Sequence, residues 1–129
     1  MTSWARWLPA AAVASGIFWF SHQSGSDFPD TGVDKIQHAL AYGVLALALW
    51  YGLGNRFGVP RVAARRGMIA ATIAALYGWS DEFHQSFIPG RDASLYDWIA
   101  DVFGAVVVVT MLVWASFAGL RGVWDNRVR

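Results

Sequence analysis

The residues of this sequence that could do chemistry come in pairs spaced four positions apart. The pairs are Asp34 and His38, Asp81 and Gln85, and Asp97 and Asp101. A spacing of four places both members of a pair on one face of an α-helix. Carboxylates beside an imidazole can act as general acid and base or hold a divalent cation. The spacing therefore predicts three helix ends that share one polar site.

We predict two sets of site residues from these pairs and their neighbours. The catalytic set is Asp34, His38, Glu82 and Asp101, and the substrate-binding set is Tyr42, Asp81, Gln85, Arg91 and Asp97. His38 with Asp34 would form the acid/base pair, and Arg91 would hold a phosphate or carboxylate in a bidentate fork. We expect no dedicated cofactor. The alternative is a divalent cation held by His38, Asp34 and Glu82, although no zinc-type H-E-x-x-H spacing is present.

Some of the same residues also have structural interpretations. Thr31-x-x-Asp34 and Ser94-x-x-Asp97 both fit the capping box, in which a carboxylate near a helix N-terminus satisfies backbone donors. The carboxylates could instead pair with the only basic side chains nearby, Lys35 and Arg91, and Tyr42 could be a packed core residue. Helix ends do not require His38, Glu82 or Asp101, so these three favour a site.

The elements that must position these residues are predicted to be four apolar helices. The chain has 129 residues, of which 56% are hydrophobic and 15% are charged. A soluble domain of this size could not bury that much apolar surface. The apolar stretches lie at about 4–20, 36–53, 67–83 and 97–118, close to or above the 17 or so residues that cross a bilayer. We predict an all-α, membrane-embedded four-helix bundle that forms a single domain.

The arginines set the expected orientation of this bundle. Except for Arg91, they lie at the start of the first stretch, between the second and third, and after the fourth: Arg6, Arg56, Arg61, Arg65, Arg66, Arg121, Arg127 and Arg129. All nine acidic residues except Asp125 lie in or beside the other two connections. The positive-inside rule therefore predicts that both termini are cytoplasmic and that the polar site faces outward. We expect a multi-pass protein of the bacterial cytoplasmic membrane.

The connections contain turn signals but no nucleotide-binding motif. Pro89-Gly90 predicts a type II turn that presents Arg91. The second connection, Gly52 to Gly67, combines glycines and Pro60 with basic residues and is expected to be a loop. The sequence has no Gly-rich phosphate loop and no nucleophile elbow, so we expect no soluble nucleotide or acyl chemistry and no nucleic-acid partner.

Over about residues 15 to 110 the chain resembles the VanZ-like family of membrane proteins. The resemblance is carried by Asp34-Lys35-Ile36-x-His38-x-x-x-Tyr42, by Asp81-Glu82-x-x-Gln85-x-Phe87-x-Pro89-Gly90-Arg91, by Asp97-x-x-x-Asp101-x-x-Gly104, and by Ser21 and Ser24-Gly25 after the first apolar stretch. Many members carry Asn at the position of Asp101. The family is named for a protein associated with teicoplanin resistance, so the resemblance implies a role in the cell envelope and no particular reaction.

The function that we predict is a polar pocket at the outer leaflet. It would bind, and in an enzymatic interpretation also modify, the anionic headgroup of an envelope lipid or a lipid-linked precursor. The main alternative is a non-enzymatic membrane protein whose polar cluster is structural or binds a partner. A third interpretation is proton-linked transport, because intramembrane Asp, Glu and His can form relays. The sequence leaves the oligomeric state undetermined.

Overall fold

The computed structural model describes residues 3–24, 33–54 and 59–127, with side chains up to residue 118. These residues form a short 3-10 helix, η1 (Ser3–Trp7), and four α-helices: α1 (Leu8–Ser21), α2 (Asp34–Gly52), α3 (Pro60–Gln85) and α4 (Leu95–Arg127). The described residues contain no strand. The predicted all-α class with four helices is therefore confirmed.

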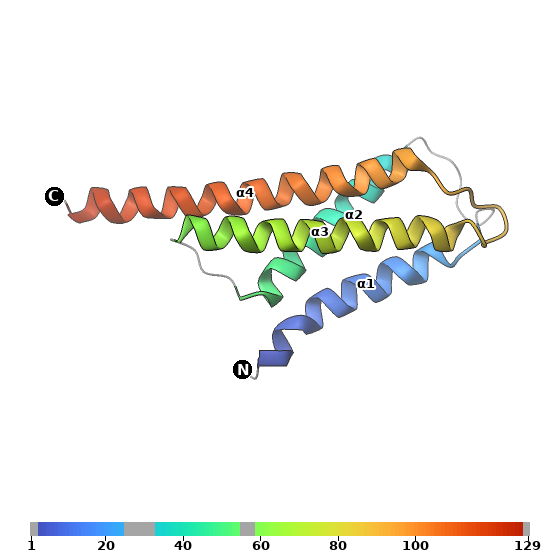
Figure 1. Cartoon of the computed structure of the whole chain (residues 1–129), viewed down its shortest axis with the longest axis horizontal. Helices are drawn as coiled ribbons and strands as arrows, with labels where there is room; N and C mark the ends of the chain where they lie inside the picture. Colours follow the sequence, from blue (N-terminus) through green and yellow to red (C-terminus); the bar gives the residue numbers. More distant parts are fainter. Residues whose placement is uncertain (1–2, 25–32, 55–58, 128–129) are drawn as a thin grey trace.

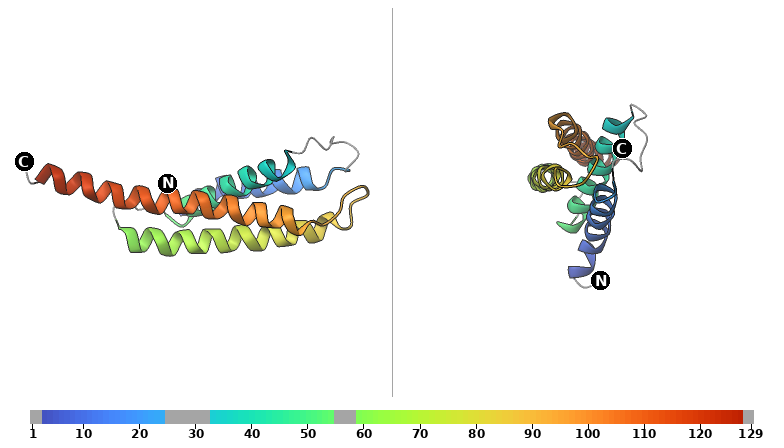
Figure 2. Two further views of the ribbon diagram at one scale, coloured as in Figure 1. Left: turned by 90° about the horizontal axis from the view of Figure 1, so that it is seen from above. Right: turned by 90° about the vertical axis from the view of Figure 1, so that its right-hand side faces the viewer.

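The helices lie beside one another with alternating direction (Figure 1). α4 packs against α2 and α3, whereas α1 packs mainly against α2. The end of α1, the start of α2, the end of α3 and the start of α4 lie at the right of Figure 1, and η1 and the far end of α4 lie toward the left. The view from above in Figure 2 shows the same arrangement. This topology brings the polar helix ends together.

Two helices begin at positions that differ from the sequence prediction, and a proline accounts for each difference. Pro9 lies in the first turn of α1, so the expected helix over 4–20 is divided into η1 and a 14-residue α-helix. Pro60 begins α3, which places Arg61 and Arg65 on the helix and not in a loop. Proline is favoured at the first turn because it has no N–H to donate and its φ is already helical.

The core of the bundle is small because the helices approach closely. It consists mostly of alanines, with Tyr42 and Trp50 as its largest members, 1% and 2% exposed. At the crossing of α2 and α4, a Cβ on Gly104 would collide with the backbone carbonyl of Ala39. Glycine at position 104 therefore lets these two backbones touch.

The outer surface carries many large apolar side chains. Leu40 on α2, Phe83 on α3 and Trp114 on α4 are 66%, 65% and 72% exposed. Among the described residues one segment, Leu95–Ala118, is by length and composition able to cross a membrane, with 24 residues and a mean hydropathy of 2.1. The other three predicted spans do not meet the same requirement within the described residues.

Candidate functional site

Three of the predicted site residues meet where α2, α3 and α4 converge. One imidazole nitrogen of His38 and one carboxylate oxygen each of Glu82 and Asp101 all lie within 4.8 Å of one another. The closest contact joins His38 Nδ1 to Asp101 Oδ1 at 2.9 Å. Asp101 is completely buried. The convergence expected from the three polar pairs is therefore observed.

His38 lies between two carboxylates from different helices. Its Nε2 is 3.9 Å from Asp34 Oδ1, one turn earlier on α2, while its Nδ1 faces Asp101 on α4. Asp34 is half exposed, with 49% of its side chain accessible. An imidazole with a buried carboxylate on one nitrogen has its ring orientation fixed. This arrangement suits a general acid or base and equally suits a metal ligand.

Asp97 takes part in an ion pair rather than in the His38 contact. Its Oδ1 is 2.6 Å from Lys35 Nζ, so the pair ties α4 to α2. The backbone N–H of Asp97 also donates to Ser94 Oγ at 3.3 Å, which is one half of the predicted capping box. At the start of α2, Val33 provides no side-chain cap, and Thr31 lies outside the described residues.

Glu82 has a structural role that the sequence did not indicate. Its Oε2 accepts a hydrogen bond at 2.7 Å from the backbone N–H of Ser94, the residue before α4. The expectation that helix ends do not require Glu82 is therefore wrong for this oxygen. The other oxygen, Oε1, is buried and has no hydrogen-bond partner among the described residues.

Asp81 and Gln85 form a second polar group, which faces α1. Gln85 Nε2 donates to Asp81 Oδ2 at 3.1 Å, as their spacing on one helix face predicts. Ser21 Oγ donates to the same carboxylate oxygen at 2.7 Å. Ser21 is 6% exposed and was not predicted as a site residue. A single serine at a helix end gives no signal, and only the resemblance to the VanZ-like family pointed to it.

Arg91 follows the turn that the sequence predicted. Gly90 has φ 76°, and the N–H of Arg91 donates to the carbonyl of Ile88 at 3.1 Å, as in a type II turn. The guanidinium reaches α1, where Nε donates to Gln23 O at 3.3 Å and Nη2 donates to Phe20 O at 3.2 Å. Arg91 thus satisfies carbonyls at the end of α1, a contact that its position in the sequence does not reveal.

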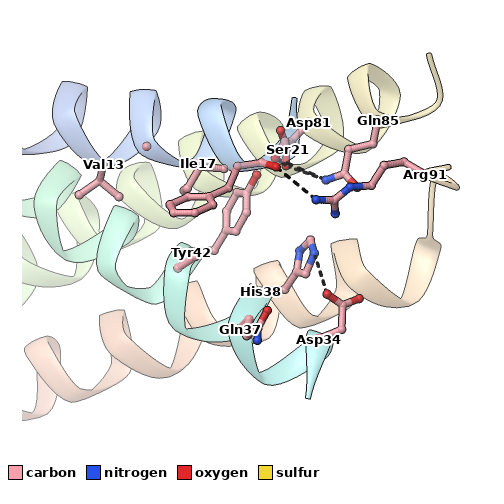
Figure 3. A pocket seen from close by; sticks show the side chains of 13 residues that line it. Val13, Ile17, Ser21, Asp34, Gln37, His38, Tyr42, Asp81, Gln85 and Arg91 are labelled. Atoms are coloured by element: carbon pink, nitrogen blue, oxygen red, sulfur yellow. Dashed lines mark hydrogen bonds and ion pairs between the residues drawn. The ribbon is translucent and has the colours of Figure 1, made fainter. Parts of the chain in front are cut away.

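A cavity of about 560 Å³ lies beside this polar group, between α1, α2 and α3. Figure 3 shows His38, Tyr42 and Asp34 on α2 facing Ser21 on α1 and the residues of α3. The predicted site residues that line the cavity are Asp34, His38, Tyr42, Asp81, Gln85 and Arg91. The remaining three are not part of this lining: Glu82, Asp97 and Asp101.

Tyr42 both packs in the core and borders the cavity. Its ring lies 6.3 Å from that of Tyr77, and its hydroxyl has no hydrogen-bond partner among the described residues. Tyr77 instead donates to the carbonyl of Ala14 at 2.8 Å. The structural and the binding interpretations of Tyr42 are therefore both compatible with its position.

The fold and the site define an α-helical protein with an apolar outer surface and a buried polar cluster at one end of its bundle. Among known protein families, VanZ/LLP1 matches residues 3–116 of the chain. The chain therefore belongs to the VanZ/LLP1 family, as its resemblance predicted. Comparisons with curated proteins and with solved structures found no match.

Proposed function

We propose that this protein is embedded in the bacterial cytoplasmic membrane and that its cavity binds a lipid with an anionic headgroup. The observation that carries the proposal is the two-sided lining of the cavity. Val13, Ile17 and Phe20 of α1 line it with apolar groups, whereas His38 and Arg91 belong to its polar side. Ligand sites of this kind combine an apolar wall with a few polar groups that fix orientation. An acyl chain fits one side and a headgroup the other.

The distribution of polar and apolar residues supports membrane embedding. Buried positions include Asp81, Glu82 and Asp101, while large apolar side chains cover the outside. Water-soluble proteins show the opposite pattern, and ionisable residues within membranes face the interior of a bundle. α2 has 19 residues and α3 has 26, so they extend about 29 and 39 Å, against a hydrocarbon core of about 30 Å.

The position of the basic residues supports an outward-facing cavity and cytoplasmic termini. Arg61, Arg65 and Arg66 lie in the first two turns of α3, at the end of the bundle where η1 lies. The cavity and the polar cluster lie at the other end. A lipid would then be taken from the outer leaflet. That leaflet is also where the lipid-bearing glycopeptide teicoplanin acts, so lipid capture there could alter teicoplanin tolerance.

The charges around the cavity restrict the class of headgroup. Arg91 brings one positive charge, which favours a phosphate or carboxylate. Asp34 and Asp81 would repel a bare anion, but they can accept hydrogen bonds from hydroxyl groups. The combination favours a phosphate that carries hydroxyl donors, as in a phosphatidylglycerol or a lipid-linked sugar phosphate.

Filling the cavity tests this proposal directly. A Cβ on Gly16 would have nothing within 4 Å, although Gly16 borders the cavity, so the Cβ of Gly16→Leu meets no clash and its side chain adds volume there. Ala12→Leu is the matched control, because Ala12 lies on the same helix, is exposed and does not line the cavity. We expect the purified protein to retain phosphatidylglycerol over phosphatidylcholine in native mass spectrometry and to lose this preference in Gly16→Leu alone. Equal retention by both variants would contradict the proposal.

A purely structural role for the polar cluster is the second candidate, and one observation favours it. Polar contacts join every helix to another: Ser21 to Asp81, Lys35 to Asp97, and His38 to Asp101. Holding the bundle together would be a sufficient role for such a network. Lipid retention distinguishes the candidates, because a purely structural cluster predicts no preference of the wild type for phosphatidylglycerol over phosphatidylcholine. Incubation of the pure protein with bound lipid then tests for an enzymatic function, in which the headgroup would be converted and His38→Gln would abolish the conversion. Unchanged lipid with the wild-type protein would indicate binding without modification.

A further inference from the structure

We propose that His38, Glu82 and Asp101 together bind one divalent transition-metal ion of the Zn²⁺ or Mn²⁺ class. The inference goes beyond lipid binding and does not depend on it. The three side chains come from three different helices, α2, α3 and α4, and their ligand atoms lie within 4.8 Å of one another. Ligands of a tetrahedral Zn²⁺ are about 3.3 Å apart, given Zn–N and Zn–O distances of about 2.0–2.1 Å. To bind the ion through Nδ1, His38 would exchange its present hydrogen bond with Asp101 for the metal.

Two buried oxygens in the group indicate that a ligand belongs there. Among the described residues, Asp101 Oδ2 and Glu82 Oε1 have no hydrogen-bond partner. The side chains are nevertheless enclosed, with Asp101 0% and Glu82 6% exposed. Buried carboxylate oxygens are nearly always satisfied, because leaving one without a partner costs about 1–3 kcal/mol or more. A cation bound by both oxygens would satisfy them.

The charge balance points in the same direction. Glu82 and Asp101 bring two carboxylates, and His38 is the only member of the group that can carry a positive charge. Buried ionised carboxylates are unfavourable unless they are paired or coordinate a metal. A divalent ion neutralises both carboxylates and leaves the imidazole uncharged, as metal binding requires.

A second group, Asp34, His38 and Asp97, has similar spacing but is a poorer site. Lys35 Nζ already lies 2.6 Å from Asp97, so an ammonium takes the place that a cation would need. Asp34 is half exposed and can remain hydrated. Because both groups use His38, the geometry favours the buried one.

The donor set determines which ions fit. One imidazole nitrogen with two carboxylates suits Zn²⁺, Mn²⁺ and related ions, whereas Mg²⁺ and Ca²⁺ prefer oxygen ligands alone. Three protein ligands also leave a coordination position open, as in catalytic zinc sites. His38 belongs to the proposed metal site and to the wall of the cavity, so the ion would lie close to a bound headgroup.

Calorimetric titration of the chelator-treated protein with Zn²⁺ tests the site. The protein should carry no histidine tag, and we expect one Zn²⁺ per chain. Glu82→Gln and Asp101→Asn should each weaken Zn²⁺ binding by at least about 100-fold. Loss of a residue that only supports a ligand costs up to about 100-fold, so loss of a ligand should cost at least as much. Asp34→Asn is the comparison: Asp34 lies near His38 but outside the proposed ligand set, so its loss should cost less than either ligand variant, within about 10–100-fold. An equal loss in all three variants, or no saturable binding by the wild type, would overturn the proposal.

A second measurement remains informative if the variants fail to fold. The exposed pair His22 and His84, with Nδ1 and Nε2 3.2 Å apart, could also bind Zn²⁺. We therefore expect His22→Asn to retain the stoichiometry, and X-ray absorption of its zinc complex to show one imidazole with oxygen ligands. Two imidazoles or oxygen ligands alone would refute the site. Lipid retention in Gly16→Leu is measured separately, so failure of one proposal leaves the other testable.

Discussion

Glu82 on α3 accepts a hydrogen bond from the backbone N–H of Ser94, 2.7 Å away across the turn into α4. In a capping box this donor would be satisfied by the side chain three residues after the cap, which is Asp97. Asp97 binds Lys35 instead. One oxygen of Glu82 thus completes the cap of α4, and the other oxygen is left without a hydrogen-bond partner among the described residues.

This contact predicts that Glu82→Ala destabilises the fold. We expect the free energy of unfolding to fall by about 1.5–3 kcal/mol, the range for a hydrogen bond to a charged group. Glu82→Gln should cost less, because the amide oxygen can still accept from Ser94. Thermal unfolding of the detergent-solubilised protein, followed by circular dichroism, measures both effects. Ser80→Ala is a control, since among the described residues the Ser80 hydroxyl donates to Tyr77 O on its own helix. Equal losses in the Ala and Gln variants would argue against the cap.

Arg91 leads to the second prediction, in which lysine cannot replace arginine. Two nitrogens of the guanidinium reach two carbonyls at the end of α1, those of Phe20 and Gln23. An ammonium keeps the charge but loses this planar fork. We expect Arg91→Lys to lose phosphatidylglycerol retention almost as completely as Arg91→Ala.

Hydrogen exchange separates the two roles of Arg91 in that experiment. If Arg91 acts by holding α1, both variants should show faster exchange of amides near residues 18–23 together with weaker lipid retention. Weaker retention with unchanged exchange would assign Arg91 to headgroup binding alone. Full retention by Arg91→Lys would contradict both roles and leave only a requirement for positive charge.

Local features of the site were predictable from the sequence because they depend on helix periodicity and turn chemistry. The four-residue spacing anticipated the bond between Gln85 and Asp81, and Pro89-Gly90 anticipated the turn. The gathering of His38, Glu82 and Asp101 followed from short connections and repeated polar pairs. The first two inferences use neighbours within one helix or one loop, and the third adds only that helices joined by short connections are antiparallel neighbours.

The particular atoms that meet across distant segments were not predictable, because reading a single sequence does not reveal which backbone group a side chain will meet. The bond from Ser21 to Asp81 joins residues 60 positions apart. The acceptors of Arg91 are backbone carbonyls, which every residue provides. The start of α3 at Pro60 was missed for a different reason, since proline and the arginines indicated a loop although proline also begins helices.

The proposed topology gives the third prediction. Val59 and Asp92 lie at opposite ends of α3 or just beyond them, and both are exposed. The chain has no cysteine, so Val59→Cys and Asp92→Cys each introduce a single thiol. In intact cells a membrane-impermeant reagent should label position 92 and not position 59. Permeabilised cells provide the control, in which both positions should react. Labelling of position 59 alone in intact cells would mean that the protein has the opposite orientation to the one proposed.

The fourth prediction compares alanine at two helical glycines. At Gly104 a new Cβ would meet the carbonyl of Ala39, and the backbones of α2 and α4 would have to separate. We expect Gly104→Ala to cost about 1–3 kcal/mol or more. Gly16→Ala meets nothing within 4 Å and should stabilise α1 by about 0.5–1 kcal/mol. Thermal unfolding of the two variants should shift in opposite directions, and a shift in the same direction would refute the close crossing.

The fifth prediction concerns Gly78, which packs directly against Asp101 of the candidate metal site. A Cβ at this position would lie 2.8 Å from Asp101 Oδ2 and 3.2 Å from the ring of Tyr42. Alanine should therefore push the Asp101 carboxylate away from its present position beside His38. We expect Gly78→Ala to weaken Zn²⁺ binding although no ligand has been changed. We also expect a loss of about 1–3 kcal/mol in stability.

A double-mutant cycle shows whether this effect acts through Asp101. Asp101→Ala removes the oxygen that the new methyl group would meet, so Gly78→Ala should cost less in that background than in the wild type. Residues in contact show coupling energies of about 0.5–3 kcal/mol, whereas independent sites add. Strict additivity in thermal unfolding would mean that Gly78 and Asp101 do not touch. In that case the carboxylate would not be held where the metal proposal requires it.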